Sequence, residues 1–271
     1  IRRHHFHAQL YACFVQQRWE PKELLVLDTD GKASEFFTRD PLASTDSRVT
    51  YVHRATTRAT LGDKRNELCL GARGAYVALF DDDAIYGKDY LATMVSALVA
   101  STAQCAVLDG HVWRWRLDTR RFEFVDKAPG TGERQVFARS AYRIDVPERR
   151  FSSVAIGEET SAWLTESVTA PAGSSCFLQV CHDDHTSYLG QPDMQPHVTY
   201  TGARISRCHT PRTWESLIEA QILLHEYIMT LSIADVLSPP RDAPMASNSH
   251  CVLLKSSTGK TRQIQHASIA T

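Results

Sequence analysis

Apolar runs that end in acidic residues stand out in the first hundred positions of the chain. Residues 75–80 read AYVALF, and three aspartates follow directly at 81–83. An apolar run without polar alternation is typical of a strand that is buried on both faces. A second run, within KELLVLDTDG at 22–31, ends in Asp28 and Asp30. Because ligands of open α/β sheets bind at the carboxyl ends of the strands, the pattern predicts a ligand site beside these acids.

Helical periodicity separates the apolar runs. Apolar residues recur at helical spacing in 2–18, in 61–74 and again in 91–99, and RVTYVH at 48–53 fits a short strand. Helices and strands therefore alternate up to about residue 101. This alternation predicts a largely parallel sheet in an α/β fold.

Three histidines, His4, His5 and His7, open the first of these helices. No carboxylate or cysteine follows them at the spacing of metal ligands. We therefore expect a solvated first helical turn at this point and no metal site.

The second half of the chain has a different pattern. Residues 111–126 alternate aromatic and charged positions around a polar turn, which predicts a β-hairpin. Further on we expect a helix from Gly157, a strand at 174–181, and an amphipathic helix at 214–237.

Two regions follow from this reading of the sequence. Residues 1–237 are expected to form one catalytic domain that is incomplete at its N-terminus. Residues 238–271, rich in Pro, Ser and Thr, are expected to form a disordered tail with a short apolar patch at 252–254. STGKT in this tail is not a phosphate loop, because Leu254 stands where that loop needs glycine.

The charge balance bears on which partners the chain can bind, and its cysteines bear on the redox compartment. The 30 basic and 31 acidic residues give a net charge of -1, so no field favours nucleic acid. Seven cysteines are scattered without CxxC spacing, which favours a reduced, cytoplasmic location. No apolar run approaches the length of a transmembrane segment.

The triple aspartate is the strongest chemical signal. Asp81, Asp82 and Asp83 repel one another, so a hard divalent cation with oxygen ligands, Mn²⁺ or Mg²⁺, would relieve the repulsion and could hold a diphosphate. The alternative is a solvated acidic turn that caps the next helix.

A basic turn lies upstream of the triple aspartate. Lys64, Arg65 and Asn66 stand near the start of the helix at 61–74, where they could meet phosphates or a nucleobase. An ordinary exposed basic turn explains them equally well.

Two further candidates lie in the second half. His182 follows a predicted strand and is a candidate metal ligand, although a turn or helix-cap role is the alternative. Glu158 and Glu159 stand in the first turn of a helix, where the helix dipole alone favours acids.

The motifs KELLVLDTDG, LGDKRNELCLGARGAYVALFDDD and GEETSAWL together resemble, in order and spacing, those of glycosyltransferase family 2. The resemblance implies a three-layer α/β/α nucleotide-diphospho-sugar transferase fold with a mostly parallel central sheet. It also implies an inverting, metal-dependent transfer, with a UDP-sugar favoured as donor and a hydroxyl group as acceptor.

The resemblance also implies roles for individual residues. Asp28 and Asp30 would hold the nucleobase and ribose, with the basic turn near the nucleotide. In the DxD motif, Asp81 or Asp82 would face the ribose and cation, and Asp83 would ligate the cation. GEET matches the GED motif, which makes Glu159 the catalytic base.

Two departures from the family pattern matter. The usual first strand, central in the sheet, is absent before the opening helix, so we expect either a fragment with exposed edges or another segment in that slot. Glutamate also replaces the aspartate of GED, which moves the carboxylate by about one methylene.

Two other classes of function stay open from the sequence alone. One is a nucleotidyltransferase of related fold, whose Gly-rich loop would precede Ile1. The other is a non-catalytic relative that acts as a binding protein. The donor sugar and the acceptor are not readable from the sequence.

Overall fold

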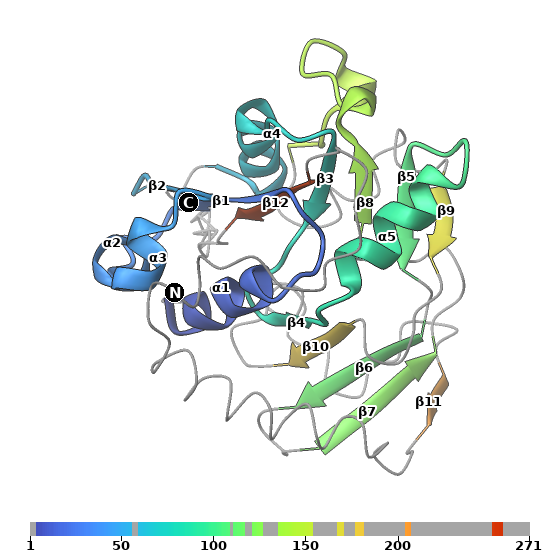
Figure 1. Ribbon diagram of the computed structural model, residues 1–271, viewed down its shortest axis with the longest axis horizontal. Helices are drawn as coiled ribbons and strands as arrows, with labels where there is room; N and C mark the ends of the chain where they lie inside the picture. The colour runs from blue at the N-terminus through green and yellow to red at the C-terminus, as the bar shows by residue number, and fades with distance from the viewer. Residues whose placement is uncertain are drawn as a thin grey trace, which may run out of the picture.

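Two β-sheets organise the part of the chain that the computed structural model describes (Figure 1). The described residues are 4–55, 59–108, 111–116, 121–126, 135–153, 167–170, 177–181, 204–206 and 251–256. The larger sheet has the strand order β2-β1-β12-β3-β8-β5-β9. Its strands are β1 (Lys22–Asp28), β2 (Val49–His53), β3 (Tyr76–Leu79), β5 (Cys105–Leu108), β8 (Gln135–Ala138), β9 (Ser167–Ala170) and β12 (Cys251–Ser256).

The four strands β2, β1, β12 and β3 run parallel to one another, whereas β8 is antiparallel to both β3 and β5. The sheet is therefore mixed, with a parallel half that contains both acidic strand ends. The predicted strands at 22–28, 48–53 and 75–80 are confirmed within one or two residues.

Helices cover both faces of the larger sheet, as the sequence predicted. They are α1 (His7–Val15), α2 (Glu35–Arg39), α3 (Pro41–Thr45), α4 (Leu61–Gly71) and α5 (Tyr90–Val99), with 3-10 turns η1 (His4–Phe6), η2 (Arg139–Ala141) and η3 (Pro147–Arg149). Alternate residues of β1 pack into two separate cores. Leu24 and Val26 join the cluster that contains α1 and α5, whereas Leu25 and Leu27 join the cluster that contains α4. The fold is thus the expected three-layer α/β/α arrangement (Figure 1).

The smaller sheet lies below the larger one in Figure 1 and has the order β11-β7-β6-β10-β4. Its strands are β4 (Ala84–Tyr86), β6 (His111–Arg116), β7 (Arg121–Asp126), β10 (Phe177–Cys181) and β11 (Arg204–Ser206). The predicted hairpin is confirmed, since β6 and β7 pair antiparallel. Strand β4 is new relative to the sequence prediction, because three residues carry too short a pattern to be recognised.

Strand β12 is the third strand of the larger sheet and pairs in parallel with β1 on one side and with β3 on the other. The expectation of a disordered tail over 238–271 is corrected for these six residues, and the rest of that tail lies outside the described residues. The slot between β1 and β3 is therefore filled by β12. The short apolar patch at 252–254 did not indicate this pairing, because the partners of Cys251 in β1 and β3, Lys22 and Tyr76, precede it by 229 and 175 positions.

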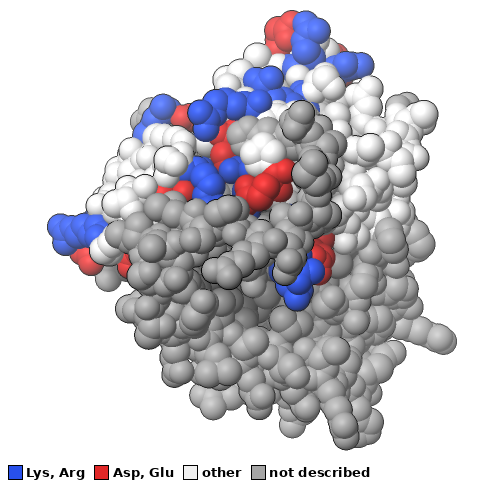
Figure 2. All heavy atoms as spheres, in the orientation of Figure 1, with Lys and Arg blue, Asp and Glu red and all other residues white. Residues whose placement is uncertain are grey.

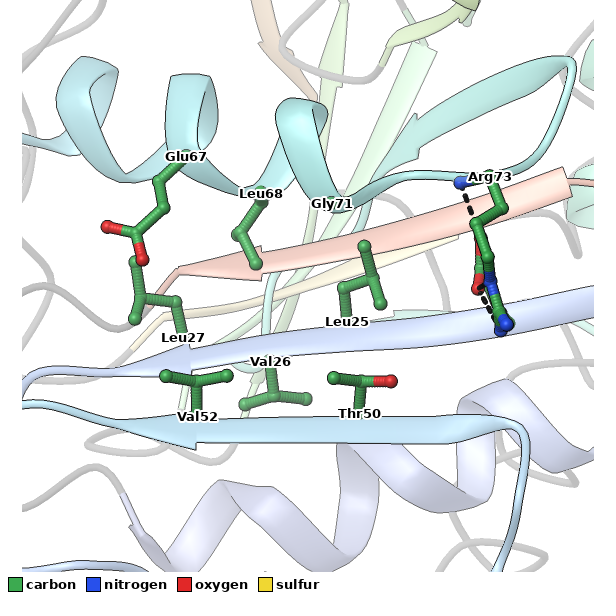
Figure 3. A pocket seen from close by; sticks show the side chains of 10 residues that line it. Leu25, Val26, Leu27, Thr50, Val52, Glu67, Leu68, Gly71 and Arg73 are labelled. Atoms are coloured by element: carbon green, nitrogen blue, oxygen red, sulfur yellow. Dashed lines mark hydrogen bonds and ion pairs between the residues drawn. The ribbon is translucent and has the colours of Figure 1, made fainter.

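A small apolar hollow of about 200 Å³ lies between α4 and the strands β1 and β2 (Figure 3). At one end of it Arg73 donates to the buried carboxylate of Glu23 through Nε, at 2.8 Å, and through its backbone N–H, at 2.9 Å. Gly71, the last residue of α4, lines this hollow. A Cβ atom at Gly71 would lie 3.8 Å from Cδ1 of Leu25, an ordinary van der Waals contact.

We expect Gly71→Ala to stabilise the fold by about 0.5–1 kcal/mol, because alanine has the higher helix propensity and its methyl group fills part of the hollow. For a chain of this size the midpoint of thermal unfolding should rise by roughly 2 °C. Differential scanning calorimetry measures this change. A lower midpoint would show that the end of α4 cannot accept a side chain.

Within the described ranges, no helix combines the length and apolar character needed to cross a bilayer. On the face shown in Figure 2, basic and acidic side chains of the described residues lie intermingled. This distribution agrees with the near-zero net charge of the sequence.

Candidate functional site

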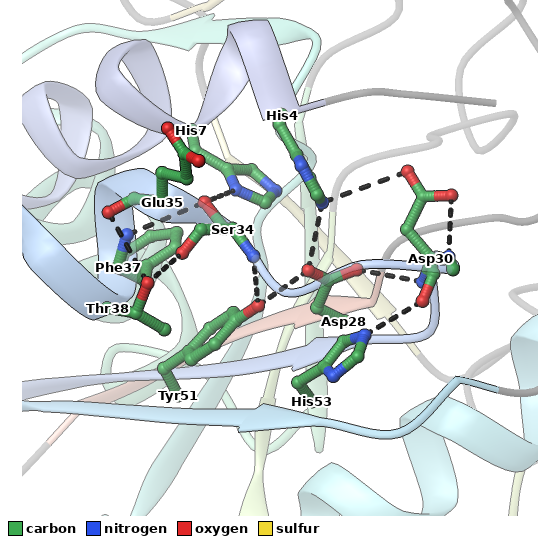
Figure 4. A network of polar contacts seen from close by, with 11 residues as sticks. His4, His7, Asp28, Asp30, Ser34, Glu35, Phe37, Thr38, Tyr51 and His53 are labelled. Atoms are coloured by element: carbon green, nitrogen blue, oxygen red, sulfur yellow. Dashed lines mark hydrogen bonds and ion pairs between the residues drawn. The ribbon is translucent and has the colours of Figure 1, made fainter.

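Asp28, the last residue of β1, is completely buried at the carboxyl edge of the larger sheet (Figure 4). The Tyr51 hydroxyl donates to its Oδ2 over 2.6 Å, and Nε2 of His4 lies 3.0 Å from the same oxygen. The backbone N–H of Asp30 donates to Oδ1 at 3.0 Å. Tyr51 reaches Asp28 because β2 runs parallel to β1 and places Tyr51 opposite Val26.

These contacts fix the charges in the cluster. Burial by itself raises the pKa of Asp28, but the hydrogen bonds from Tyr51 and the Asp30 N–H, with the charges of His4 and His7, outweigh burial and hold this pKa below its usual range. Burial and then the hydrogen bond to Asp28 raise the pKa of the Tyr51 hydroxyl. At neutral pH Asp28 is therefore an anion and Tyr51 a neutral donor.

Ser34 connects this cluster to α2 (Figure 4). Its backbone N–H donates to Oη of Tyr51 at 2.7 Å, and its Oγ lies 2.7 Å from Nδ1 of His7. The same Oγ caps α2 by accepting the N–H of Phe37 at 3.5 Å. Thus α1, α2, β1 and β2 are joined through polar side chains at one place.

The expectation of a solvated first turn is therefore wrong for His4 and His7. His7 is fully buried, and His4 lies against Asp28. Their partners, Ser34 and Asp28, stand more than 20 positions away along the chain, so helical periodicity carries no information about the contact. The sequence signal that could have indicated this network is Asp28 at the end of one strand together with Tyr51 on the next strand.

Asp30 borders an open cavity of about 680 Å³ beside the buried Asp28. The imidazole Nε2 of His53 lies 2.8 Å from the backbone carbonyl oxygen of Asp30 and supports this turn from β2. The residues that line the cavity come from the start of the chain and from the segment after β1: His4, His5, Asp30, Gly31, Lys32, Ala33, Ser34, Glu35 and Phe36.

The triple aspartate follows β3 at the same edge of the sheet. Asp81 is half exposed, whereas Asp82 and Asp83 are buried. The backbone N–H of Asp81 donates to the Tyr86 hydroxyl at 2.8 Å, and the amide nitrogen of Gln9 donates to the carbonyl oxygen of Asp82 at 3.3 Å. Tyr86 of β4 and Gln9 of α1 thus fix the acidic turn, which is not simply a solvated turn because Asp82 and Asp83 are buried.

The basic turn of α4 is largely buried. Lys64 is 3% exposed and Arg65 is 7% exposed, so the reading as an ordinary exposed turn is wrong for these two residues. Nη2 of Arg65 lies 3.8 Å from Oδ1 of Asp81, and its guanidinium group lies over the ring of Phe151 at 5.8 Å. The structure therefore brings Arg65 of the basic turn beside Asp81 of the acidic turn.

Asn66 has a different role in the described structure. Its amide nitrogen donates to the carbonyl oxygen of Phe151 at 2.9 Å, and its amide oxygen accepts the N–H of Phe151 at 3.0 Å. The Tyr142 hydroxyl also donates to that oxygen at 3.2 Å. Asn66 therefore fastens the segment around Phe151 against α4, a structural role that the sequence did not indicate.

Glu158, Glu159 and His182 lie outside the described residues. Among the residues that are described, no three histidine, cysteine, aspartate or glutamate side chains gather as a metal-binding group. The carboxylates of Asp81 and Asp83 nevertheless suit Mg²⁺ or Mn²⁺, because such ions take oxygen ligands and need only one or two carboxylates when substrate phosphates complete the shell. The donor set of the acidic turn fits a cation of this type.

Comparison with known proteins decides the family. The model of the family described as "Glycosyl transferase family 2" matches residues 8–145, which is just over half of the chain. The chain belongs to glycosyltransferase family 2. The family match contains both acidic strand ends and the basic turn, whereas Glu158, Glu159 and His182 lie beyond it.

Solved structures also match this family 2 chain. One is S. aureus TarS, residues 1–349, in complex with UDP-GlcNAc, at 11% sequence identity and a TM-score of 0.48. That match covers 65% of the present chain and 55% of the TarS chain. No curated protein matches the chain.

Proposed function

We propose that this chain transfers a sugar from a nucleoside diphosphate donor to an acceptor hydroxyl group with the help of a divalent cation. The observation that carries the proposal is the common carboxyl edge of β1 and β3. Only β12 separates these two parallel strands, so the acids after β1 and the acids after β3 lie at the same edge of the sheet, where ligands of open α/β sheets bind. Membership of family 2 supports sugar transfer as the reaction.

The cavity beside Asp30 is the proposed place of the nucleobase. Its volume of about 680 Å³ falls in the usual range for small-molecule pockets. Uracil presents an imide N–H that a carboxylate can accept, whereas adenine presents a ring acceptor at the comparable edge. Asp30 is better placed than Asp28 for this contact, because Asp30 lines the cavity and Asp28 is buried. A UDP-sugar is therefore the proposed donor. Asp28 would hold Asp30 in place by accepting its backbone N–H.

Asp81 and Asp83, with His182, are the proposed ligands of Mn²⁺ or Mg²⁺, and Asp82 belongs to the same turn. When bound, such a cation neutralises the charge of the leaving diphosphate. The register of β10 against β4 supports His182: Gln179 lies opposite Ala84 in an antiparallel pair, so the chain leaves Cys181 in the direction of the acidic turn. Arg65 supplies positive charge beside the same turn, and Lys64 precedes it in α4.

Glu159 is the proposed base, with Glu158 as its neighbour in the same helical turn. A base is needed because the acceptor hydroxyl must lose its proton as it attacks the anomeric carbon. A single direct displacement inverts the configuration at that carbon and requires no covalent intermediate on the protein.

Isothermal calorimetry with nucleoside diphosphates and Mn²⁺ tests the proposed donor site. UDP should bind more tightly than ADP by about 10-fold to 100-fold, since an unpaired buried acceptor costs roughly 1–3 kcal/mol. Guanine also carries a ring N–H, so GDP is the rival donor nucleotide, and we expect UDP to bind more tightly than GDP because a purine needs a larger pocket. Mn²⁺ alone should bind weakly, because the phosphates complete its coordination shell. Asp81→Asn and Asp83→Asn should each lower the affinity for UDP with Mn²⁺ by about tenfold.

Asp89→Asn is the matched control for this experiment. Asp89 lies in the same stretch of chain, but it is exposed and pairs with Arg18 at 3.2 Å, away from the acidic turn. Its replacement should leave UDP affinity unchanged. Tighter binding of GDP or ADP would refute the uridine donor, and Mn²⁺ affinity that is equal with and without nucleotide would refute the shared metal site.

A further inference from the structure

His4 contacts both acids that end the β1 segment, and it also lines the cavity beside them (Figure 4). Its Nε2 lies 3.0 Å from Oδ2 of Asp28 and 3.7 Å from Oδ2 of Asp30. The side chain of His4 is 26% exposed and that of Asp30 is 17% exposed, so water and salt screen this pair less than an exposed pair. The imidazole therefore lies against the same carboxylate that the nucleobase is proposed to use.

The hydrogen bond to Asp28 determines which nitrogen of His4 gains or loses a proton. Asp28 is an anion at neutral pH and only accepts, so Nε2 carries the hydrogen in the neutral ring. A second proton adds at Nδ1 and makes the ring a cation. Histidine is the side chain that changes charge between about pH 5 and pH 8. At the acidic end of this range the cation attracts Asp30, whereas the neutral ring keeps its hydrogen bond to Asp28 and has no charge with which to attract Asp30.

We propose that the protonated imidazole of His4 competes with the nucleobase for Asp30, so that the donor nucleotide binds when His4 is neutral. This inference rests on the proposed function and adds a residue that controls entry to the same site. Oδ1 of Asp30 accepts the N–H of Gly31 at 3.1 Å and Oδ2 faces His4, so both oxygens are engaged before a base arrives. An imide N–H that takes Oδ2 must therefore displace the charge of His4 from it.

Other ionisable groups surround His4 in the described structure. They are His5 and His7 on η1 and α1, Asp28 and Asp30 after β1, Lys32 and Glu35 across the cavity, and Tyr51 and His53 on β2. Burial and the hydrogen bond to Asp28 raise the pKa of Tyr51, so its hydroxyl stays neutral. The other histidines can change charge in the same pH range, but they remain in every variant of His4. A comparison of variants at one pH therefore isolates the contribution of His4.

Two replacements of His4 should have opposite effects. His4→Gln keeps an N–H group and carries no charge, whereas His4→Lys is a cation throughout the range. Calorimetry measures the affinity of the three proteins for UDP with Mn²⁺ at about pH 5.5 and about pH 8. The terminal phosphate of UDP also changes charge in this range, equally for all three proteins, so the proteins are compared at each pH separately.

At about pH 5.5, His4→Gln should bind UDP about tenfold more tightly than the unmodified chain, because a group that must first lose a proton lowers affinity about tenfold one pH unit below its pKa. At about pH 8 the two should differ by less than about threefold, and His4→Lys should bind UDP about tenfold more weakly than the unmodified chain. A His4 that only supported the fold would make both variants bind more weakly at both pH values.

The outcomes distinguish this inference from the proposed function. If His4→Gln kept the pH dependence of the unmodified chain, or bound UDP less tightly at about pH 5.5, the competition would be refuted while the donor site stands. If the unmodified chain binds none of UDP, GDP and ADP with Mn²⁺ at either pH, the proposed function fails, and this inference fails with it. Thermal unfolding of both variants checks that the fold is intact.

Uridine provides a test on the unmodified chain that does not depend on how the variants fold. It carries no phosphate and needs no cation, so a change in its affinity between about pH 5.5 and about pH 8 comes from the protein. NMR titration should show an affinity about tenfold higher at the higher pH. A constant affinity for uridine over this range would overturn the role of His4.

Discussion

Replacing Glu159 with glutamine is expected to lower the turnover number by about 10²-fold to 10⁴-fold, which is the usual contribution of a general base. Glutamine keeps the size of the side chain but cannot accept the proton of the acceptor hydroxyl. The affinity for UDP with Mn²⁺ should stay within a few-fold, because the base contacts the acceptor and not the nucleotide. Initial rates of UDP release and calorimetry on the same preparation measure the two quantities.

Glu158→Gln is the matched control, since it removes one carboxylate from the same helical turn. Its turnover number should fall by much less than that of Glu159→Gln. The reverse ranking would move the role of base to Glu158. A large loss of UDP affinity in Glu159→Gln would place this residue on the donor side and contradict its assignment as base.

The second large effect concerns the stability of the fold. Asp28→Asn should lower the free energy of unfolding by about 2–4 kcal/mol, because the hydrogen bonds from Tyr51, His4 and the Asp30 N–H lose a charged acceptor. Asp30→Asn is the control. Its side chain borders the cavity, so its replacement should weaken UDP binding with a smaller effect on stability. Urea denaturation of both variants measures the difference.

The same carboxylate makes stability depend on pH. The pKa of Asp28 is lower in the folded chain than its usual value. Its contribution is therefore fully present above the unfolded pKa of about 4 and is lost as the pH falls through the folded pKa. The unmodified chain should lose stability below about pH 4, and Asp28→Asn should lose less over the same interval. If the free energy of unfolding fell equally with pH in both proteins, the proposed role of Asp28 in the cluster would be wrong.

Local patterns predicted most of the fold because most of the elements are defined locally. The unbroken apolar run before Asp28 indicated a strand buried on both faces, and all seven residues of β1 are buried. The alternation at 111–126 indicated a hairpin, and β6 pairs with β7. In each case the periodicity of the side chains reflects the burial that the element finally adopts.

Features that depend on distant partners were not predicted. His7 is polar and opens a helix, so a solvated position was the natural expectation, yet Ser34 and the start of α2 enclose it. Strand β12 has an ordinary short apolar pattern in a polar region. It forms a strand because β1 and β3 both offer it backbone hydrogen bonds, which the local pattern does not reveal. The acids of the candidate site were identified from the sequence, whereas the supporting residues Tyr51 and His53 became apparent only from the register of β2 against β1.

The position of β12 between β1 and β3 affects the order in which the chain can acquire its structure on the ribosome. Cys251 follows Asp28 by more than two hundred residues, so β1 and β3 leave the ribosome long before the strand that joins them. Until then each exposes an unpaired backbone edge, which is a surface that recruits other strands. Closing the sheet also requires contacts of very long sequence separation, which are typical of slow folding. The nascent chain thus has to remain protected from aggregation until nearly all of this sequence has been synthesised.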